Sequence, residues 1–259
     1  MKQMIFRVLP IFLIILAGLL SVVGCSQSES PTAMKAAIID QLDVLYPNEV
    51  FKKNATQQLE TLGLEVDVFH GDEITVDFYR HLPEQGYRII IFRVHSGLLA
   101  GNPNHEGITW LYTNEPYSKT AHLTDQLTDR ATMAQTSMDS PKFFAISSKF
   151  IQNGMKGEFD NTVIILLGCD SMHLTDLAFS LVDRGASVCI GWHRSVTLDH
   201  SDSTFSILLD KLCSSNTNIV EGMLETMQEC GPDPETGATL KYYPQNSGIK
   251  ELEALIKAQ

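Results

Sequence analysis

The sequence predicts an α/β fold with a central, mostly parallel sheet of about six strands. Residues 163–167, Val-Ile-Ile-Leu-Leu, form an unbroken aliphatic run, which is typical of a strand buried on both faces of a parallel sheet. Residues 36–40 and 87–94 are further apolar strands, and segments with helical periodicity separate them. Because β-α-β units cross over with one handedness, we expect parallel neighbours with helices on both faces.

The composition limits the size of the domain and the kind of partner. The chain has 259 residues, of which 44% are hydrophobic, enough to bury a core in one large domain. Its 19 basic and 31 acidic residues give a net charge of −12, which repels nucleic-acid phosphates. We therefore expect no nucleic-acid partner.

Residues 1–24 are expected to be an export signal. Lys2 and Arg7 supply positive charge, and residues 8–23 contain no ionisable group. This apolar stretch is short for a membrane span and has the length of a signal-peptide core. An uncleaved N-terminal anchor is the alternative, and both interpretations leave the folded part outside the cytoplasm.

Residues 22–25, Val-Val-Gly-Cys, resemble the bacterial lipobox. The resemblance implies a lipoprotein in which Cys25 is acylated, for example with palmitate, and becomes the new N-terminus. It also implies that residues 25–33 form a flexible tether. Residues 34–259 are then a domain held at the extracytoplasmic face of the cell membrane by this lipid anchor alone.

The first part of the domain alternates strands and helices. The strand at residues 36–40 is followed by a helix over residues 48–62, with Asn48 as its N-cap and Gly63 as its stop. The pattern continues with a strand at residues 64–69, a helix at 77–85 and a strand at 87–94.

Residues 98–161 interrupt this alternation as an insertion-like segment. Their periodicity is weak, and we expect a hairpin around residues 107–112 and a helix around residues 140–153. A segment of this length between two core strands is more often functional than a plain connection. After the strand at 163–167 the pattern predicts a helix at residues 174–182, a strand at 187–192, helices at 203–213 and 219–228, a turn at 231–237 and a terminal helix at 248–258.

Two of the apolar strands end in residues that can carry chemistry. The strand at residues 87–94 leads into His95, and the strand at 163–167 leads, after a glycine, into Cys169. If the two strands are neighbours in a parallel sheet, their ends lie roughly 5 Å apart, at the edge where open α/β sheets bind ligands. An imidazole can take the proton of a thiol, which is a poor nucleophile until it is deprotonated. His95 and Cys169 are therefore a candidate catalytic dyad.

Both strand ends, Val-His-Ser-Gly at residues 94–97 and Leu-Gly-Cys-Asp-Ser at residues 167–171, resemble the signature of the caspase-like (clan CD) cysteine peptidases. In that family an apolar strand ending in His-Gly precedes one ending in a small residue and the catalytic Cys. Residues 184–192 are similar to the strand that follows the nucleophile in the CHAT-type prokaryotic members. The resemblance covers roughly residues 36–228 and implies a three-layer αβα sandwich.

The resemblance also implies the roles of single residues. Cys169 is the nucleophile, His95 handles the proton, and the backbone amides of Gly97 and Cys169 form the oxyanion hole. Trp192 and Arg194 lie at the end of the fifth strand, where the family lines its substrate groove, and an exposed Arg194 beside a packed Trp192 is the alternative. The implied activity is that of an exported, lipid-anchored cysteine endopeptidase acting on peptide or protein substrates, with no cofactor and no metal.

Two positions depart from the family pattern. The family usually has Gly directly after the catalytic His, where this chain has Ser96, and it often has Ala before the Cys, where this chain has Gly168. These departures keep open an alternative from another functional class, a catalytically inactive caspase-like domain that binds a partner at the cell envelope.

Other candidate sites have weaker patterns. A zinc site from His95, Cys169 and His173 lacks an obvious closed ligand set. The pair of His193 and His200 is more typical of a solvated loop. A glutamine-amidotransferase-like hydrolase is excluded, because it has its Cys before its His.

The remaining cysteines are not arranged as a disulfide scaffold, because no close paired spacing occurs. Cys189 lies in an apolar strand and is interpreted as a packing residue. Cys213 and Cys230 are the pair to expect if the exported domain contains a disulfide.

Overall fold

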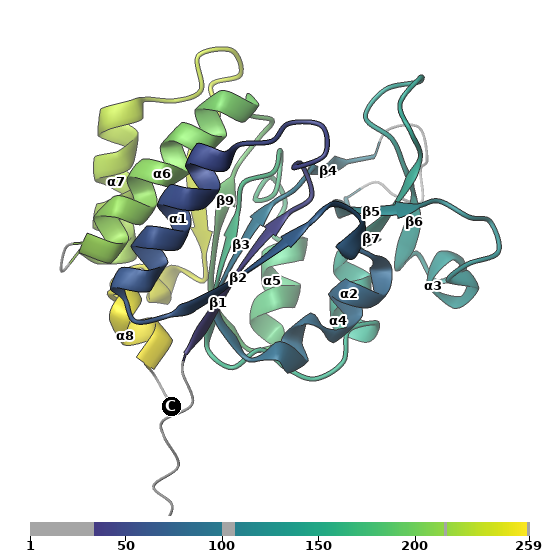
Figure 1. The fold of residues 1–259 in the computed structure, drawn as a ribbon, viewed down its shortest axis with the longest axis horizontal. Helices are drawn as coiled ribbons and strands as arrows, with labels where there is room; N and C mark the ends of the chain where they lie inside the picture. Colours follow the sequence, from purple (N-terminus) through teal and green to yellow (C-terminus); the bar gives the residue numbers. More distant parts are fainter. Residues whose placement is uncertain (1–33, 100–106, 215–216, 258–259) are drawn as a thin grey trace, which may run out of the picture. The chain divides into compact units, whose positions relative to one another are not determined.

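The described residues contain a central sheet of six strands in the order β10-β9-β8-β3-β1-β2 (Figure 1). The computed structural model describes residues 34–99, 107–214 and 217–257, and the expected signal peptide, Cys25 and the tether lie outside these residues. Each neighbouring pair is parallel except β9 and β10. The predicted α/β class and mostly parallel six-stranded sheet are confirmed. The strands are β1 (Lys35–Asp40), β2 (Glu65–His70), β3 (Tyr87–Arg93), β8 (Thr162–Leu166), β9 (Ala186–Trp192) and β10 (Leu240–Tyr243).

Strands β3 and β8 are neighbours, as a site built from their ends requires. Phe92 of β3 pairs with Leu166 of β8, and the amide of Leu167 donates a hydrogen bond to the carbonyl of Phe92 at 2.9 Å. Both strands therefore finish at the same edge of the sheet, and His95 and Cys169 follow there.

Helices cover both faces of the sheet, with α1, α6, α7 and α8 on one side and α2, α4 and α5 on the other (Figure 1). Within β1, Ala36 and Ile38 belong to one buried cluster and Ala37 and Ile39 to the other, because successive side chains of a strand point to opposite faces. The sandwich has the predicted three layers. The helices are α1 (Glu49–Thr61), α2 (Val76–His81), α4 (Ser148–Asn153), α5 (Asp176–Asp183), α6 (Leu198–Ser214), α7 (Ile219–Cys230) and α8 (Leu252–Lys257).

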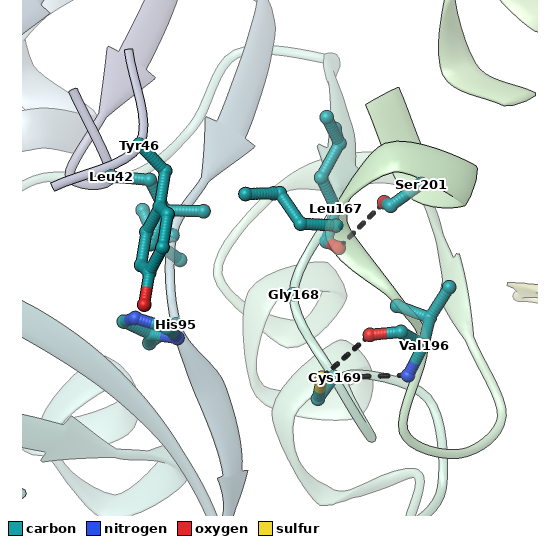
Figure 2. A pocket seen from close by; sticks show the side chains of 10 residues that line it. Leu42, Tyr46, His95, Leu167, Gly168, Cys169, Val196 and Ser201 are labelled. Carbon is teal, nitrogen blue, oxygen red and sulfur yellow. Dashed lines mark hydrogen bonds between the residues drawn. The ribbon is translucent and has the colours of Figure 1, made fainter. Parts of the chain in front are cut away.

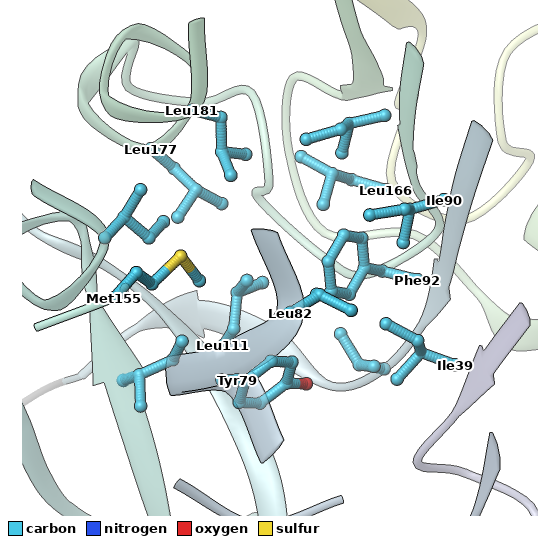
Figure 3. Packing of buried hydrophobic residues seen from close by; sticks show 14 of the residues in the cluster. Ile39, Tyr79, Leu82, Ile90, Phe92, Leu111, Met155, Leu166, Leu177 and Leu181 are labelled. Carbon is cyan, nitrogen blue, oxygen red and sulfur yellow. The ribbon is translucent and has the colours of Figure 1, made fainter. Parts of the chain in front are cut away.

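The segment between β3 and β8 forms a second sheet, which the sequence did not predict. Its four strands run in the order β4-β5-β7-β6, and all its paired strands are antiparallel. Leu111 of this sheet packs with Tyr79 of α2, Leu177 of α5 and Phe92 of the central sheet in one cluster (Figure 3). The strands are β4 (Ser96–Leu98), β5 (Thr109–Pro116), β6 (Ala131–Ala134) and β7 (Phe143–Ser147), and helix α3 (Leu123–Leu127) lies between β5 and β6.

Three local predictions were wrong. The hairpin expected around residues 107–112 is displaced, because residues 109–111 of β5 pair antiparallel with the preceding strand β4 rather than with a strand that follows them directly. The helix expected at residues 140–153 begins only at Ser148, because residues 143–147 pair with strands on both sides. Strand β10 was missed, and the terminal helix begins at Leu252 rather than Gly248. Short 3-10 turns occur at Gly71–Glu73, Leu82–Gln85 and Gln245–Ser247.

Within the described ranges, no helix is both long enough and apolar enough to cross a membrane.

Gly185, between α5 and β9, offers a test of this packing. Its φ is +102°, and an added Cβ would lie 2.1 Å from the carbonyl oxygen of Phe159. We expect Gly185→Ala to lower the free energy of unfolding by about 3 kcal/mol, from left-handed strain plus a backbone clash. Urea unfolding followed by circular dichroism measures the change.

Gly86→Ala is the matched control, because Gly86 has a φ of +72° but open space around it. Strain alone should lower its unfolding free energy by about 1 kcal/mol. Equal losses in the two variants would contradict the clash at Gly185.

Candidate active site

His95 lies in the short link between β3 and β4 and is held through its backbone. Its amide donates to Oε1 of Gln41 at 2.9 Å, and its carbonyl accepts from the amide of Tyr112 at 3.0 Å. The imidazole packs edge-on against Tyr46, with ring centroids 6.3 Å apart, and tilted against Tyr112 at 5.7 Å. Its Nε2 is shielded from solvent and has no hydrogen-bond partner among the described residues. This nitrogen has no competing partner, but the imidazole has to turn before a bound group can reach it.

Cys169 lies in the turn that follows β8. Its Sγ donates to the carbonyl of Val196 and accepts from the amide of Val196, both at 3.4 Å. The next residue, Asp170, adopts a left-handed φ of +54° and accepts a hydrogen bond from Ser195 at 2.8 Å. These hydrogen bonds hold the turn after β8 against Ser195 and Val196, which follow β9.

His95 and Cys169 line the same pocket and lie on opposite walls of it (Figure 2). The pocket has a volume of about 280 Å³ and opens at the carboxyl edge of the central sheet. No hydrogen bond joins the imidazole to the thiol within the described part of the chain. The lining residues are Leu42, Tyr46, Val94, His95, Leu167, Gly168, Cys169, Val196, Leu198 and Ser201.

The environment of both groups favours their uncharged forms. Burial raises the pKa of the Cys169 thiol, and the charge of Asp170 adds to this, while hydrogen bonds from backbone amides of Val196 and of Cys169 itself oppose it. Burial, and then the nearby charge of Arg93, lower the pKa of His95. At neutral pH the site therefore holds a thiol and a neutral imidazole, and the proton has to move when the thiol attacks.

Ser96 and Gly168, the two departures from the family pattern, are in contact with each other. A Cβ added to Gly168 would lie 2.2 Å from Oγ of Ser96 and 2.5 Å from the carbonyl oxygen of Val94. The Ser96 hydroxyl also donates to the carbonyl of Cys169 at 2.6 Å. The Ser96 hydroxyl occupies the space that the methyl group of an alanine at position 168 would fill. The serine at 96 and the glycine at 168 are therefore complementary.

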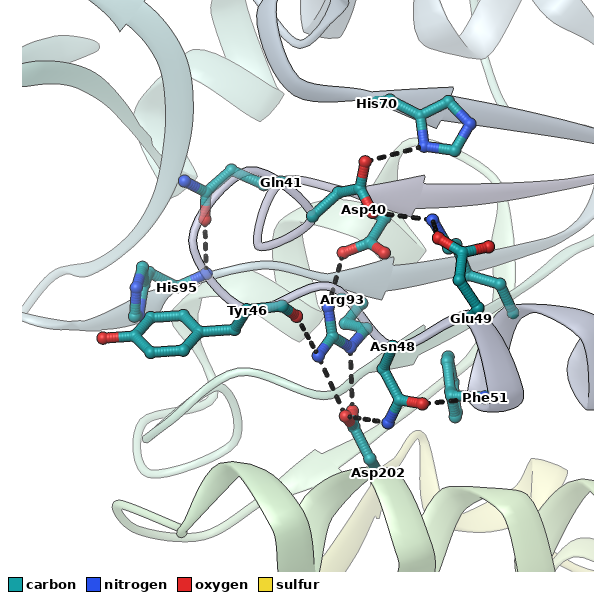
Figure 4. A network of polar contacts seen from close by, with 12 residues as sticks. Asp40, Gln41, Tyr46, Asn48, Glu49, Phe51, His70, Arg93, His95 and Asp202 are labelled. Carbon is teal, nitrogen blue, oxygen red and sulfur yellow. Dashed lines mark hydrogen bonds and ion pairs between the residues drawn. The ribbon is translucent and has the colours of Figure 1, made fainter.

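The buried guanidinium of Arg93 is the centre of a polar network that includes the backbone of the pocket residue Tyr46 (Figure 4). Arg93 is 1% exposed and donates to Asp202 through Nε and Nη2, both at 2.9 Å, to Asp40 through Nη1 at 2.8 Å and to the carbonyl of Tyr46 at 2.8 Å. Burial disfavours its charge, but the bonds and charges of Asp202 and Asp40 outweigh this and raise its pKa. The network ties β1, the turn after it and α6 to the end of β3.

The other residues singled out in the sequence lie elsewhere. Gly97 pairs with Trp110 in the second sheet, next to the site. Trp192 is fully buried, and its indole packs against Phe205 in the core. It does not line the pocket, in contrast to the groove role that the resemblance implied. Arg194 is exposed and donates to the carbonyl of Thr236 at 3.2 Å, away from the pocket wall.

Among the described residues, the histidines and cysteines outside the pocket form no metal-binding cluster. His173 contacts the carbonyl of His193 at 3.0 Å, and His200 packs against Trp192. In residues 34–99, 107–214 and 217–257, no three His, Cys, Asp or Glu side chains converge on a point that could hold a metal. The four described cysteines are free thiols, so the expected pair is not bonded: Cys169, Cys189, Cys213 and Cys230.

The sequence did not point to the pocket walls. Leu42 and Tyr46 come from the turn after β1, and Val196, Leu198 and Ser201 come from the segment after β9 and the first turns of α6. The available signal was the group of apolar residues Leu42, Val44, Leu45 and Tyr46, interrupted by Asp43, which no predicted helix or strand includes.

The fold, with its parallel central sheet and helices on both faces, is similar to that of a solved cysteine proteinase. The Arg specific cysteine proteinase gingipain R (RGPB) has a similar structure, with a TM-score of 0.53 over 85% of this chain and 48% of that chain, at 10% sequence identity. At this identity the likeness shows the fold, and the chain spans about half the length of the gingipain. No protein-family model matches the chain, and no curated protein matches its sequence.

The contact between Ser96 and Gly168 predicts that the two positions are energetically coupled. We expect Gly168→Ala to destabilise the protein by about 2–3 kcal/mol through overpacking, and Ser96→Gly to cost less. The double variant should recover part of the loss, because the clash with the hydroxyl is gone while the contact with the Val94 carbonyl remains. Urea unfolding of the three variants gives the coupling energy, and simple additivity would contradict the complementarity.

The pKa shifts predict how Cys169 reacts with iodoacetamide. Only the thiolate is alkylated, and burial raises the pKa of Cys169, so the rate should rise with a midpoint above the ordinary thiol value of about 8.5. Because the pKa of His95 is lowered, His95→Ala should leave this midpoint unchanged at alkaline pH. Mass spectrometry of the modified peptide measures the rate. A midpoint below pH 7 would instead indicate a preformed thiolate and imidazolium.

Proposed function

We propose that this chain is a cysteine endopeptidase in which Cys169 attacks the scissile carbonyl and His95 transfers the proton. One observation carries the proposal: the two side chains come from the ends of adjacent parallel strands and line one pocket from opposite walls. The similarity of the fold to a cysteine proteinase supports it. The Arg specificity named for that protein is not carried over, because the likeness concerns the fold.

The proposed reaction has two balanced steps. In the first, a bond forms between Sγ of Cys169 and the carbonyl carbon, the C–N bond breaks, and the thiol proton passes through His95 to the leaving amine. In the second, water attacks the thioester, His95 accepts its proton and the thiolate recovers one, which releases the acid product. Both steps begin and end with neutral groups, in keeping with the lowered pKa of His95 and the raised pKa of Cys169.

The positions of the imidazole and the thiol in the pocket suit these two roles. With the imidazole and the thiol on opposite walls, a peptide bond can lie between them, so that the sulfur faces the carbonyl carbon and the imidazole faces the amine (Figure 2). Hydrogen bonds of catalytic groups often form only with substrate present. Nε2 of His95 has no hydrogen bond to give up, and in the proposed reaction the imidazole turns so that this buried nitrogen reaches the substrate.

Backbone amides are proposed to stabilise the oxyanion. The amide of Cys169 lies close enough to its own sulfur to lower the pKa of the thiol, so it is near the carbon that the sulfur would attack. Gly97, two residues after His95, is the proposed second donor. Since main-chain groups would do this work, Ser96 in place of glycine does not remove them.

The setting of the enzyme is part of the same proposal. The export signal and the lipobox-like Cys25 support a domain tethered by lipid at the extracytoplasmic face of the cell membrane. The substrates would then be peptides or proteins at the cell envelope.

An inactive binding domain is the second candidate, and a specific observation favours it. The thiol of Cys169 already makes two hydrogen bonds to Val196, and its raised pKa makes it a weak nucleophile without substrate. In such a protein the pocket would bind a peptide without cleaving it.

A peptidyl acyloxymethyl ketone distinguishes the two candidates. This electrophile alkylates an active-site thiol only when the imidazole and the oxyanion donors assist, so we expect labelling of Cys169 in the full chain under reducing conditions. Cys169→Ala should abolish labelling, and His95→Ala should slow it by about 100-fold, the usual size of general acid-base assistance.

Cys213→Ala is the matched control, because Cys213 is a half-buried free thiol outside the pocket, and it should leave labelling unchanged. Absence of labelling in folded protein that still binds the peptide would sink the peptidase proposal in favour of the binding domain.

A further inference from the structure

The pocket between His95 and Cys169 contains no charged side chain. Apart from the dyad, its walls are aliphatic or aromatic, with Leu42, Leu198 and Val196 prominent, and Ser201 is the one lining hydroxyl group besides that of Tyr46. The hydroxyl of Ser201 is engaged, since it donates to the carbonyl of Leu167 at 2.9 Å and accepts from the indole of Trp192. The described walls therefore offer little polar recognition beyond the dyad.

The charged groups near the pocket do not line it. Arg93 is shared between Asp40 and Asp202, and none of the three lines the pocket. The carboxylates of Asp170 and Asp233 act on the Cys169 thiol through their charge, but both lie outside the lining and are engaged by hydroxyl groups of other residues. A lysine, arginine or aspartate side chain in the pocket would thus lose its hydration and find no partner of opposite charge among the lining side chains.

The turn that supplies Leu42 and Tyr46 to the pocket wall carries exposed apolar side chains. Val44 is 68% exposed, Leu45 57% and Tyr46 50%. Val44 lies against Gly71, after β2, and of the three only Tyr46 lines the pocket. The half-exposed ring of Tyr46 therefore adds apolar surface at the pocket itself.

The size of the pocket fits the scissile peptide unit together with one side chain. At about 280 Å³ it is below the range of sites that enclose a whole drug-sized ligand. The substrate atom nearest the thiol is the scissile carbonyl carbon, so the side chain nearest to the pocket walls is the one on the residue that carries this carbonyl.

We propose that this pocket selects an uncharged, apolar side chain, of the size of leucine, methionine or phenylalanine, on the residue whose carbonyl is attacked. This inference rests on the proposed peptidase function and names its substrate class. A basic or acidic residue at that position is disfavoured by the loss of hydration, and we expect a preference of about 100-fold or more in kcat/KM for leucine over lysine, arginine or aspartate.

The test uses two sets of peptides that differ only at this residue, which is Leu, Phe, Asn, Asp, Lys or Arg. Fluorogenic peptides report kcat/KM with the full chain. Product-like peptides that end in the same residues report Kd with the Cys169→Ala variant by calorimetry, which needs no catalysis. We expect Leu and Phe to be preferred in both measurements.

The outcomes separate this inference from the proposed function. Hydrolysis with Arg, Lys, Asp or Asn preferred, or with no preference, overturns the pocket assignment and leaves the peptidase. Preferred binding of the Leu and Phe peptides without hydrolysis or Cys169 labelling keeps the pocket assignment and overturns the peptidase. Absence of binding and hydrolysis for every peptide overturns both.

A charge introduced into the wall gives an independent test. Leu198 lines the pocket at the start of α6, where an acidic residue suits the helix dipole, so Leu198→Asp should fold. We expect it to shift the preference from Leu toward Lys and Arg by at least about 10-fold. Leu127→Asp, at an 83% exposed position of α3 outside the pocket lining, is the matched control and should leave the preference unchanged.

Discussion

The arrangement of the site depends on how one buried cation is neutralised. The guanidinium of Arg93 is removed from water, so its charge has to be paired inside the protein. Its partners are Asp40 at the end of β1, the Tyr46 carbonyl in the following turn and Asp202 in α6, which is 109 residues away in sequence. These bonds hold the turn after β1 and the start of α6, which supply two walls of the pocket, against the end of β3 next to His95. The apolar pocket therefore lies next to an ionic network whose charged side chains do not line it.

The sequence was most informative where a segment is apolar without interruption. Strands β3 and β8 were predictable because both their faces are buried by helices, and the order of strand and helix predicts parallel neighbours. Residues 143–147, Phe-Phe-Ala-Ile-Ser, suit a strand or a helix equally, and only pairing with β5 and β6 decides for a strand. The four-residue edge strand β10 has the exposed Lys241 and gives almost no pattern.

The candidate site was predictable in its reactive groups but not in its walls. His95 and Cys169 stand out because each directly follows an apolar strand or its closing glycine. The wall residues Leu42 and Leu198 come from connecting segments, whose course depends on contacts distant in sequence. Arg93 was missed for a related reason: an arginine in a strand is ordinarily read as exposed, and its acidic partners are visible only in the folded chain.

The contact between Ser96 and Gly168 has a consequence for how such a site can change over generations. A serine after the histidine and an alanine before the cysteine exclude each other in this backbone, since the methyl carbon would lie 2.2 Å from the hydroxyl oxygen. Removing the serine is not sufficient to admit the alanine, because the methyl carbon would still lie 2.5 Å from the Val94 carbonyl oxygen. A change from one pairing to the other therefore requires a shift of the backbone at Val94 as well as two substitutions, and the residues at positions 96 and 168 are best judged as a pair.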